Sequence, residues 1–335
     1  MKKLPILAGL AALLLLIGCG TQEEAYQHYD FFAMDTSMRL TLRGDNALSD
    51  ATVTEQHIRA LEDALSRTRE DSLVAKLNRG ETVEDADLAG LLRLCIDYTK
   101  KTDGAFDATV AEVVAAWGFT ADSYRVPAAE ELAALLMYVG SDGIVLDGDT
   151  ISLRENVQLD LGGIAKGYAS DCVKALWEER GIESGIAALG GNIYCRGEKN
   201  DGSRWTVGIR DPKAADGYVG LLSLSDCFAV TSGGYERWFE DENGNIYHHI
   251  IDPKTGYPAK SGLSSVTVVS ESGTQADVLS TALYVLGAEK SIALWRELGG
   301  FELVLVTEDA RVLVTEGLEG SFESAAEDYS YEYIR

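Results

Sequence analysis

Basic side chains are scarce in this 335-residue chain, because 29 lysines and arginines stand against 54 aspartates and glutamates and the formal net charge is −25. A surface of that sign repels phosphate backbones and anionic lipid headgroups, which argues against nucleic acid as a partner. Any phosphate site must therefore be made locally, by backbone N–H groups, a lysine or a metal ion. The length suffices for one large domain or two small ones with a buried core.

Cysteine and histidine are also rare, with five and four copies. No two cysteines stand in C-x-x-C spacing, and no His/Cys pattern of a zinc site is present. Apart from Cys19, the cysteines lie within apolar patterns, so we expect buried free thiols at Cys95, Cys172, Cys195 and Cys227. One disulfide is compatible with an oxidising compartment, but the spacing does not say which pair would form it.

Long apolar runs are limited to the N-terminus. Two lysines precede an apolar run over 4–17 that is too short to span a bilayer comfortably, and small residues follow it, which predicts a signal peptide over 1–18. Residues 16–19, LIGC, resemble the bacterial lipobox, in which cleavage leaves the cysteine N-terminal and acylated. An ordinary signal peptide is the alternative. We expect an extracytoplasmic chain, lipid-anchored to a bacterial membrane at Cys19 through a polar tether over 19–30.

Internal repeats, low-complexity blocks and clear linkers are absent. Mixed helices and hairpins without regular β–α alternation indicate an α+β fold, with one large domain over 31–320 and an acidic tail over 321–335 that we expect to be loose at its end. Apolar spacing predicts helices around 58–65, 88–95, 130–138, 276–286 and 289–298, strands around 39–42, 186–196, 204–210, 221–232, 247–251 and 263–270, and hairpins over 144–153, folded at 147–148, and 301–315.

The central stretch of the chain is 158–171, QLDLGGIAKGYASD. An extended apolar lead-in reaches Gly162-Gly163, and a helical pattern starts beside Lys166. A helix N-terminus of this kind presents free N–H groups and the positive end of the helix dipole, which favour a phosphate. The spacing fits neither the P-loop nor the Rossmann pattern. A tight strand-to-helix turn with a solvated lysine explains the stretch equally well.

Asp277 and Thr281 would lie one turn apart on one helix face, where a carboxylate and a hydroxyl, joined by a backbone carbonyl, suit Mg²⁺. However, Thr274 and Asp277 also match the spacing of a capping box, which is the commoner use of this pattern. His248 and His249 share a strand, so their rings point to opposite faces and one of them at most can serve as a general base at a given site. A surface-facing and core-facing pair remains the alternative.

Two further glycine pairs stand at expected strand ends, at 190–191 and 233–234. Glycine lets a ligand approach the backbone closely, although a bulge or a turn explains each pair separately. Three such pairs together favour one shared ligand cleft.

Taken in order, five pieces of the chain resemble the ApbE family of flavin transferases, many of which are bacterial lipoproteins. The resemblance covers about 31–315, and the run HIIDPKTGYP from 249 to 258 is its most specific part. The five pieces are Met34-Asp35-Thr36, 159–167, Thr231-Ser232-Gly233, 249–258 and 276–282.

The resemblance implies that FAD binds in a cleft between two lobes with Mg²⁺, and that FMN passes to a threonine hydroxyl of an acceptor protein, one that belongs to a membrane or extracytoplasmic redox system, while AMP is released. Asp277, Thr281 and the backbone oxygen of Ala165 would hold Mg²⁺. His249 would be the base, with His248 facing away. The flavin or diphosphate would be lined by Met34, Trp117, Gly118, Phe119, Gly162, Lys166 and Ile251.

Two positions depart from the family pattern. Where relatives often read like STYRPDS, residues 66–72 lack the tyrosine, and Ala188 stands where an asparagine often precedes the glycine pair. An altered cleft wall could admit water or a second metal. An FAD pyrophosphatase that yields FMN and AMP is therefore the second interpretation, and a flavin-binding lipoprotein without turnover is the third.

Overall fold

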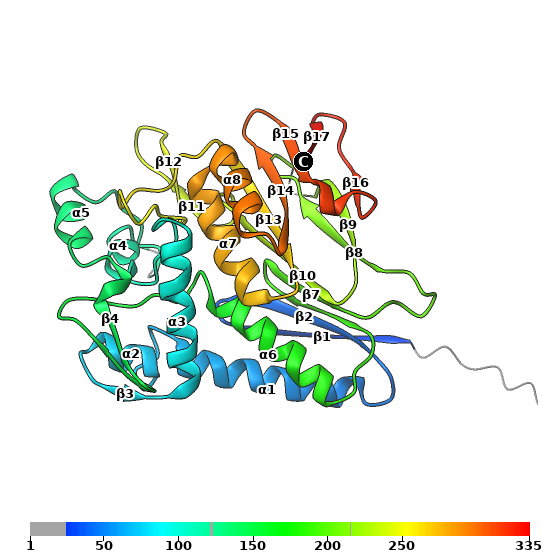
Figure 1. Ribbon diagram of the computed structural model, residues 1–335, viewed down its shortest axis with the longest axis horizontal. Helices are drawn as coiled ribbons and strands as arrows, with labels where there is room; N and C mark the ends of the chain where they lie inside the picture. Colours follow the sequence, from blue (N-terminus) through cyan, green and yellow to red (C-terminus); the bar gives the residue numbers. More distant parts are fainter. Residues whose placement is uncertain (1–24, 121–122, 215) are drawn as a thin grey trace, which may run out of the picture.

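A nine-stranded sheet forms the centre of the protein (Figure 1). The computed structural model describes residues 25–120, 123–214 and 216–335. All neighbours in the sheet are antiparallel except β15 and β17. In spatial order the strands are β1 (Tyr26–Ala33), β2 (Thr36–Arg43), β6 (Gly185–Leu189), β7 (Asn192–Arg196), β10 (Cys227–Gly233), β13 (Leu263–Ser270), β14 (Phe301–Thr307), β15 (Arg311–Thr315) and β17 (Ser330–Ile334).

Both faces of this sheet are covered, so its inner strands read as nearly continuous apolar runs. In β14, Leu303 and Leu305 join the core under the helices, while Val304 and Val306 join a core under a second, three-stranded sheet. The helices are α1 (Ala47–Leu65), α6 (Ala165–Glu179), α7 (Gly273–Leu286) and α8 (Ala288–Leu298), and the second sheet contains β8 (Trp205–Arg210), β9 (Tyr218–Leu224) and β16 (Phe322–Ser324).

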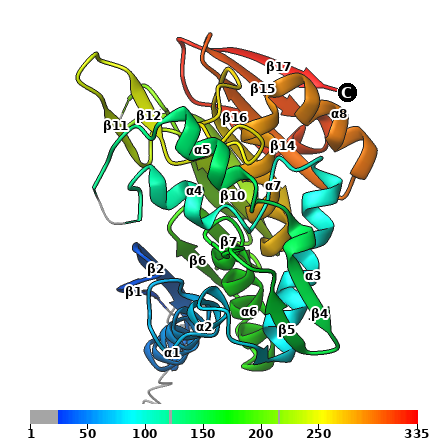
Figure 2. The same cartoon turned by 90° about the vertical axis from the view of Figure 1, so that its left-hand side faces the viewer.

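A mainly helical group of elements packs beside α6 and α7, with α3 buried along one face (Figures 1 and 2). The end of α4 contacts the small β11–β12 hairpin through aromatic rings. The remaining elements are α2 (Leu73–Asn78), α3 (Ala86–Lys101), α4 (Ala111–Ala116), α5 (Ala129–Leu136), β3 (Val83–Glu84), β4 (Ile144–Asp147), β5 (Thr150–Leu153), β11 (Trp238–Glu240), β12 (Ile246–His248) and the 3₁₀ turns η1 (Ser141–Gly143) and η2 (Glu316–Leu318).

The α+β prediction is confirmed, and the predicted helices and hairpins have their counterparts. The turn of the β4–β5 hairpin is one residue later than predicted, at Gly148-Asp149, because Asp147 pairs with Thr150. Glycine at the first turn position adopts a φ of 60°, which a two-residue hairpin turn requires.

Both ends of the described chain are more ordered than the sequence predicted. The tether was expected to reach residue 30, but β1 begins at Tyr26 and pairs with β2 from there. The tail was expected to be loose, but β16 pairs with β9 and β17 pairs with β15. Tyr331 explains part of this order, because its hydroxyl donates to the Val219 carbonyl and its ring lies beside Phe322. The predicted signal peptide and Cys19 lie outside the described residues.

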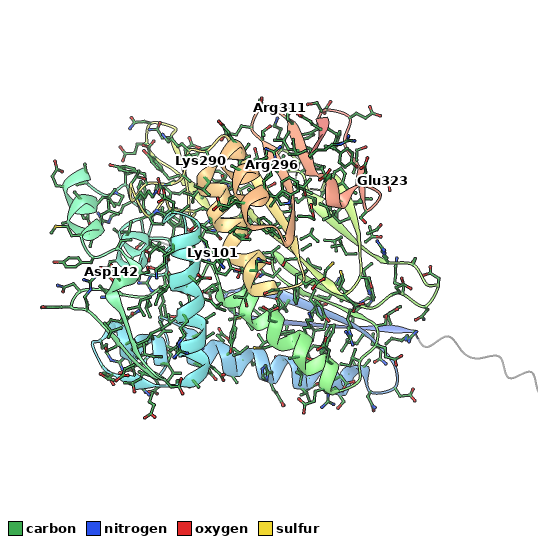
Figure 3. The ribbon with its side chains drawn as sticks, in the orientation of Figure 1. Lys101, Asp142, Lys290, Arg296, Arg311 and Glu323 are labelled. Atoms are coloured by element: carbon green, nitrogen blue, oxygen red, sulfur yellow. The ribbon has the colours of Figure 1, made fainter. Side chains whose placement is uncertain are left out.

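The thiols of the four described cysteines are free, as expected, but only Cys95 and Cys195 are fully buried, and Cys172 and Cys227 are partly exposed. Within the described ranges no helix has both the length and the apolar character needed to cross a bilayer. Among the described residues, Asp107 and Asp277 are charged side chains that are buried. Figure 3 labels six charged side chains that are exposed: Lys101, Asp142, Lys290, Arg296, Arg311 and Glu323.

Candidate active site

Helices α6 and α7 approach each other closely at two glycines. A Cβ added to Gly167 would stand 2.4 Å from the carbonyl oxygen of Gly273 and 2.5 Å from the Cβ of Asp277, so only glycine fits there. The Gly167 N–H donates to Asp277 Oδ2 at 2.7 Å. The glycine corner, which is residues 162–167 at the start of α6, therefore meets Asp277 of α7. This contact is a condition of the predicted metal site.

The capping-box interpretation of Asp277 is wrong. Helix α7 begins at Gly273, after the N-cap residue Ser272, whose Oγ accepts from the Gln275 N–H. Asp171 of α6 accepts from two N–H groups of the first turn of α7, at 2.7 and 2.8 Å. Since these side chains satisfy the helix start, Asp277 lies one turn inside the helix and its carboxylate faces the glycine corner instead.

Thr281 follows Asp277 by one turn of α7. Its Oγ1 lies 3.4 Å from Ser232 Oγ on β10, and that hydroxyl is 2.8 Å from Ser280 Oγ. A Cβ added to Gly163 would stand 3.6 Å from Thr281 Oγ1, so the hydroxyl also borders the glycine corner. The carboxylate and hydroxyl predicted to share an ion thus face the same corner.

The surroundings of Asp277 favour a cation beside it. Burial raises the pKa of Asp277, and Lys166, the Gly167 N–H and the side chain of Asn192 oppose that rise. An ionised carboxylate that is only 4% exposed costs free energy unless positive charge or hydrogen bonds compensate it. Among the described residues, no group of three or more His, Cys, Asp or Glu side chains could hold a metal. A carboxylate, the Thr281 hydroxyl and the Ala165 carbonyl are nevertheless all hard oxygen ligands, which fit Mg²⁺.

Lys166 connects the acidic part of the site to the histidine. It acts electrostatically on Asp277, on Glu236 and on His249, so all three lie within its reach. Glu236 was not predicted from the sequence. Partial desolvation raises the pKa of Glu236, Lys166 and Arg210 oppose the rise, and Asp277 adds to it.

The position of His249 leaves one ring nitrogen available. Its backbone N–H donates to the Arg237 carbonyl at 3.0 Å, and its Nδ1 lies 3.2 Å from the same oxygen. A carbonyl only accepts, so Nδ1 carries the proton and Nε2 is the basic nitrogen. Burial lowers the pKa of His249 to about 4, an effect that the Arg237 carbonyl opposes. The ring is therefore neutral at pH 7 and able to accept a proton.

The contacts of the His248 ring are structural ones. Its Nε2 donates to the Ala259 carbonyl at 2.9 Å, and its Nδ1 accepts from the Ile250 N–H at 3.3 Å. The ring meets Tyr284 of α7 edge-on. With both nitrogens engaged, His248 holds the β12 segment against α7.

The segment Trp117–Phe119 lies with Ile251 in one apolar cluster against the β11–β12 hairpin. Trp117 Nε1 donates to the Gly256 carbonyl at 2.7 Å, which ties the segment to the turn after His249. The Trp117 and Phe119 rings are only 0% and 2% exposed, so they support the segment from inside rather than offering an open ring face. Gly118 has a φ of 82°, and a Cβ there would be 2.0 Å from the Ser123 carbonyl oxygen, so the turn requires glycine.

Met34 stands at the tip of the β1–β2 hairpin. The two-residue turn Met34-Asp35 has φ values of 49° and 57°, a conformation that usually selects asparagine or glycine. Backbone strain of this kind concentrates at functional sites. The Met34 side chain packs against both cores beneath the helices, so the turn holds it where the two cores meet.

The glycine pairs lie close to further residues of the site, of which Asn192 and Glu236 were not predicted. A Cβ on Gly191 would stand 2.8 Å from the Thr231 carbonyl oxygen and 3.7 Å from Glu236 Oε1. Asn192, beside Asp277, directly follows Gly190-Gly191, and Ser232 and Glu236 flank Gly233-Gly234. The glycine pairs could therefore have indicated that the residues beside them belong to the site. Nothing in the sequence indicated Arg237.

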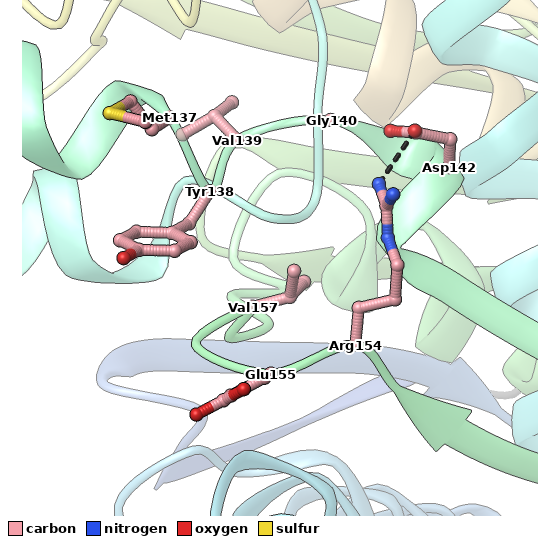
Figure 4. Close-up of a pocket in the computed structure, with 8 residues that line it drawn as sticks. All are labelled: Met137, Tyr138, Val139, Gly140, Asp142, Arg154, Glu155 and Val157. Atoms are coloured by element: carbon pink, nitrogen blue, oxygen red, sulfur yellow. Dashed lines mark ion pairs between the residues drawn. The ribbon is translucent and has the colours of Figure 1, made fainter.

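A separate hollow of about 600 Å³ opens between the end of α5 and the β4–β5 hairpin (Figure 4). An ion pair of 2.6 Å between Arg154 and Asp142 closes one side of it. None of the predicted site residues lines it. Its lining residues are Met137, Tyr138, Val139, Gly140, Asp142, Arg154, Glu155 and Val157.

Comparison with known proteins gives a consistent result. The sequence pattern of the ApbE family matches residues 34–305. The FAD:protein FMN transferase of Treponema pallidum (strain Nichols) is 37% identical over 278 residues, which cover 77% of this chain and 76% of the relative.

Solved structures of ApbE proteins resemble this chain in fold. The crystal structure of the ApbE protein from Thermotoga maritima matches with a TM-score of 0.83 at 33% identity, over 88% of this chain and 99% of that one. The apo form of the flavinyl transferase ApbE from Pseudomonas stutzeri matches with a TM-score of 0.80 at 29% identity, over 90% and 98% of the two chains. By sequence and by fold, this chain belongs to the ApbE family.

Proposed function

We propose that this protein is an FAD:protein FMN transferase that moves the FMN half of FAD to a threonine hydroxyl of an acceptor protein and releases AMP. The name of its relatives and the meeting of Asp277 with the glycine corner of α6 support this proposal. In this reaction the threonine oxygen bonds to the phosphorus of the FMN half. The bond from that phosphorus to the bridging oxygen breaks, and AMP leaves with that oxygen.

The chain's own residues have distinct tasks in this reaction. His249 Nε2 takes the proton of the threonine hydroxyl, and Arg237 keeps the ring in the required tautomer. Lys166 places a positive charge beside the diphosphate. Asp277, Thr281 and the Ala165 carbonyl would hold Mg²⁺, which supplies charge neutralisation on the phosphate oxygens. The flavin would be bounded by Met34, Gly162, Ile251 and the segment 117–119.

A substitution of Asp277 tests the metal assignment. Asp277→Asn keeps an oxygen for the Gly167 N–H and removes the charge, so the protein should fold while Mg²⁺-dependent FMN transfer falls by about 10²-fold or more. Asp45→Ala, on the exposed turn between β2 and α1, is the control and should transfer normally. The readout is the mass of a threonine-bearing acceptor after incubation with FAD and Mg²⁺, which should rise by FMN minus one water. Full transfer by Asp277→Asn would remove the metal assignment.

The second candidate is hydrolysis of FAD to FMN and AMP. One observation favours it: a hollow of about 410 Å³ is lined by Arg67, Thr68 and Gln158, at the segment that lacks the expected tyrosine and beside the start of the central stretch. FAD and Mg²⁺ without an acceptor separate the two reactions. Rapid AMP release would favour the hydrolase, whereas slow release that an acceptor accelerates supports the transferase. Intact FAD with a verified acceptor would leave only flavin binding.

We also propose that the mature chain works outside the cytoplasm, anchored by lipid on Cys19, and that its acceptor belongs to a membrane or extracytoplasmic redox system. This rests on the sequence of residues 1–19. Expression in bacteria with and without Cys19→Ala tests it. The wild-type chain should fractionate with membranes and carry an acylated N-terminal cysteine, and the variant should carry none.

A further inference from the structure

Cys195 and Cys227 stand directly opposite each other on neighbouring strands. They are register partners in the antiparallel pair β7–β10. Residues in such positions point to the same face of the sheet, with Cα atoms about 4.5–5.5 Å apart. A disulfide requires Cα atoms about 4.4–6.8 Å apart, so the backbone already meets this condition without rearrangement.

Both cysteines face the same apolar layer between the large sheet and the β8–β9–β16 sheet. Cys195 belongs to that core and Cys227 packs against its edge. Burial raises the pKa of both thiols, that of Cys227 to about 11, and the charge of a Cys227 thiolate would add to the rise at Cys195. The Cys227 charge thus acts on Cys195, as expected for residues that face each other across this strand pair.

We propose that Cys195 and Cys227 form a redox site, a dithiol that a disulfide-bearing oxidant converts into a disulfide linking β7 to β10. The Cys227 thiolate, the more accessible one, attacks a sulfur of the oxidant and expels one thiol. The Cys195 thiolate then attacks the Cys227 sulfur and expels the second thiol. One S–S bond forms, the oxidant's S–S bond is reduced, and the two protons of the cysteines pass to the released thiols.

The linked strands carry parts of the candidate active site at their other ends. Asn192 begins β7 beside Asp277, and Ser232 lies near the end of β10 beside Thr281. A covalent link at the Cys195 end fixes the register of this strand pair. The oxidised protein should therefore resist unfolding of the part of the sheet that presents these side chains.

The wild-type full chain tests the proposal without any substitution. The protein is reduced with dithiothreitol, freed of reductant, incubated with oxidised glutathione, then denatured, alkylated and digested with trypsin. The expected product is peptide 181–196 linked to peptide 214–237, reversed by dithiothreitol, while Cys95 and Cys172 are alkylated before and after oxidation. Alkylation of both Cys195 and Cys227 after oxidation, a lasting glutathione adduct on Cys227, or a link to another cysteine would overturn it.

Thermal unfolding supplies a second measurement. Oxidation should raise the Tm of the wild-type chain by roughly 3–8 °C. The double variant Cys195→Ser/Cys227→Ser should show no such rise, and Cys172→Ser, which changes a cysteine of similar exposure on α6, should keep it. Equal Tm values for the oxidised and reduced wild-type chain would show that the link does not hold the sheet together.

Discussion

At the scale of single residues, the surroundings of His249 fix the tautomer of its ring and lower its pKa. His249 is tied to the Arg237 carbonyl through Nδ1, and burial lowers its pKa to about 4 from an ordinary value near 6.5. A base needs its free nitrogen unprotonated, and this ring meets that condition across the whole neutral range. Its neighbour His248 has both nitrogens occupied and cannot substitute for it.

The pH dependence of FMN transfer should reflect the lowered pKa of His249. Because the pKa of His249 is lowered, Nε2 stays unprotonated as pH falls through 6.5, and kcat/KM should remain flat until pH approaches about 4. The same shift makes the fold less stable as pH falls from about 6.5 to about 4, since the unfolded ring binds a proton there and the native ring does not. A rate that halves near pH 6.5 would contradict the assignment.

Replacing each imidazole ring in turn distinguishes the roles of the two histidines. His249→Gln should lower FMN transfer by about 10²–10⁴-fold with little change in Tm. His248→Ala should instead lower the Tm, because it removes the hydrogen bonds of the ring to the Ala259 carbonyl and the Ile250 N–H. Paired kinetic and calorimetric measurements on both variants check this. The reverse pattern would assign the catalytic role to His248.

At the scale of elements, the site depends on how closely α6 approaches α7. One face of α7 carries Asp277, Thr281 and Tyr284, which meet the glycine corner, β10 and His248 in turn. Sequence patterns predicted both helices and the first two of these residues. They did not predict that Ser272 and Asp171 satisfy the start of α7, because the Asp171 contact joins helices about a hundred residues apart.

Two variants, each with one glycine replaced by alanine, test the contact between α6 and α7. Gly167→Ala forces a Cβ to within 2.4 Å of the Gly273 carbonyl oxygen, so we expect a loss of about 1–3 kcal/mol in the free energy of unfolding. Gly90→Ala in α3 meets nothing within 4 Å and should stabilise the protein by about 0.5–1 kcal/mol. Denaturant unfolding measures both. Equal effects would mean that α6 and α7 are farther apart than described.

At the scale of the whole molecule, local patterns identified most of the fold but misjudged its ends. The α+β class followed from helix and strand periods, which depend on neighbouring residues. The prediction of a loose tail rested on its acidic residues, Glu323, Glu327, Asp328 and Glu332. Aromatic residues alternate along the same segment. Only the long-range pairing of β17 with β15, and of β16 with β9, gives those rings a surface to cover.

Two tyrosines of β17 test whether the tail is part of the fold. Tyr331 is half-buried, and its hydroxyl donates to the Val219 carbonyl and accepts from the Ala326 N–H, so Tyr331→Ala should cost about 2–3 kcal/mol of stability. Tyr333, on the same strand, is 41% exposed, and Tyr333→Ala should change stability by less than about 1 kcal/mol. Denaturant midpoints measured with an unchanged m-value decide between them. If both substitutions prove equally mild, β17 contributes little to the sheet, and the acidic residues describe the tail better than its aromatic ones do.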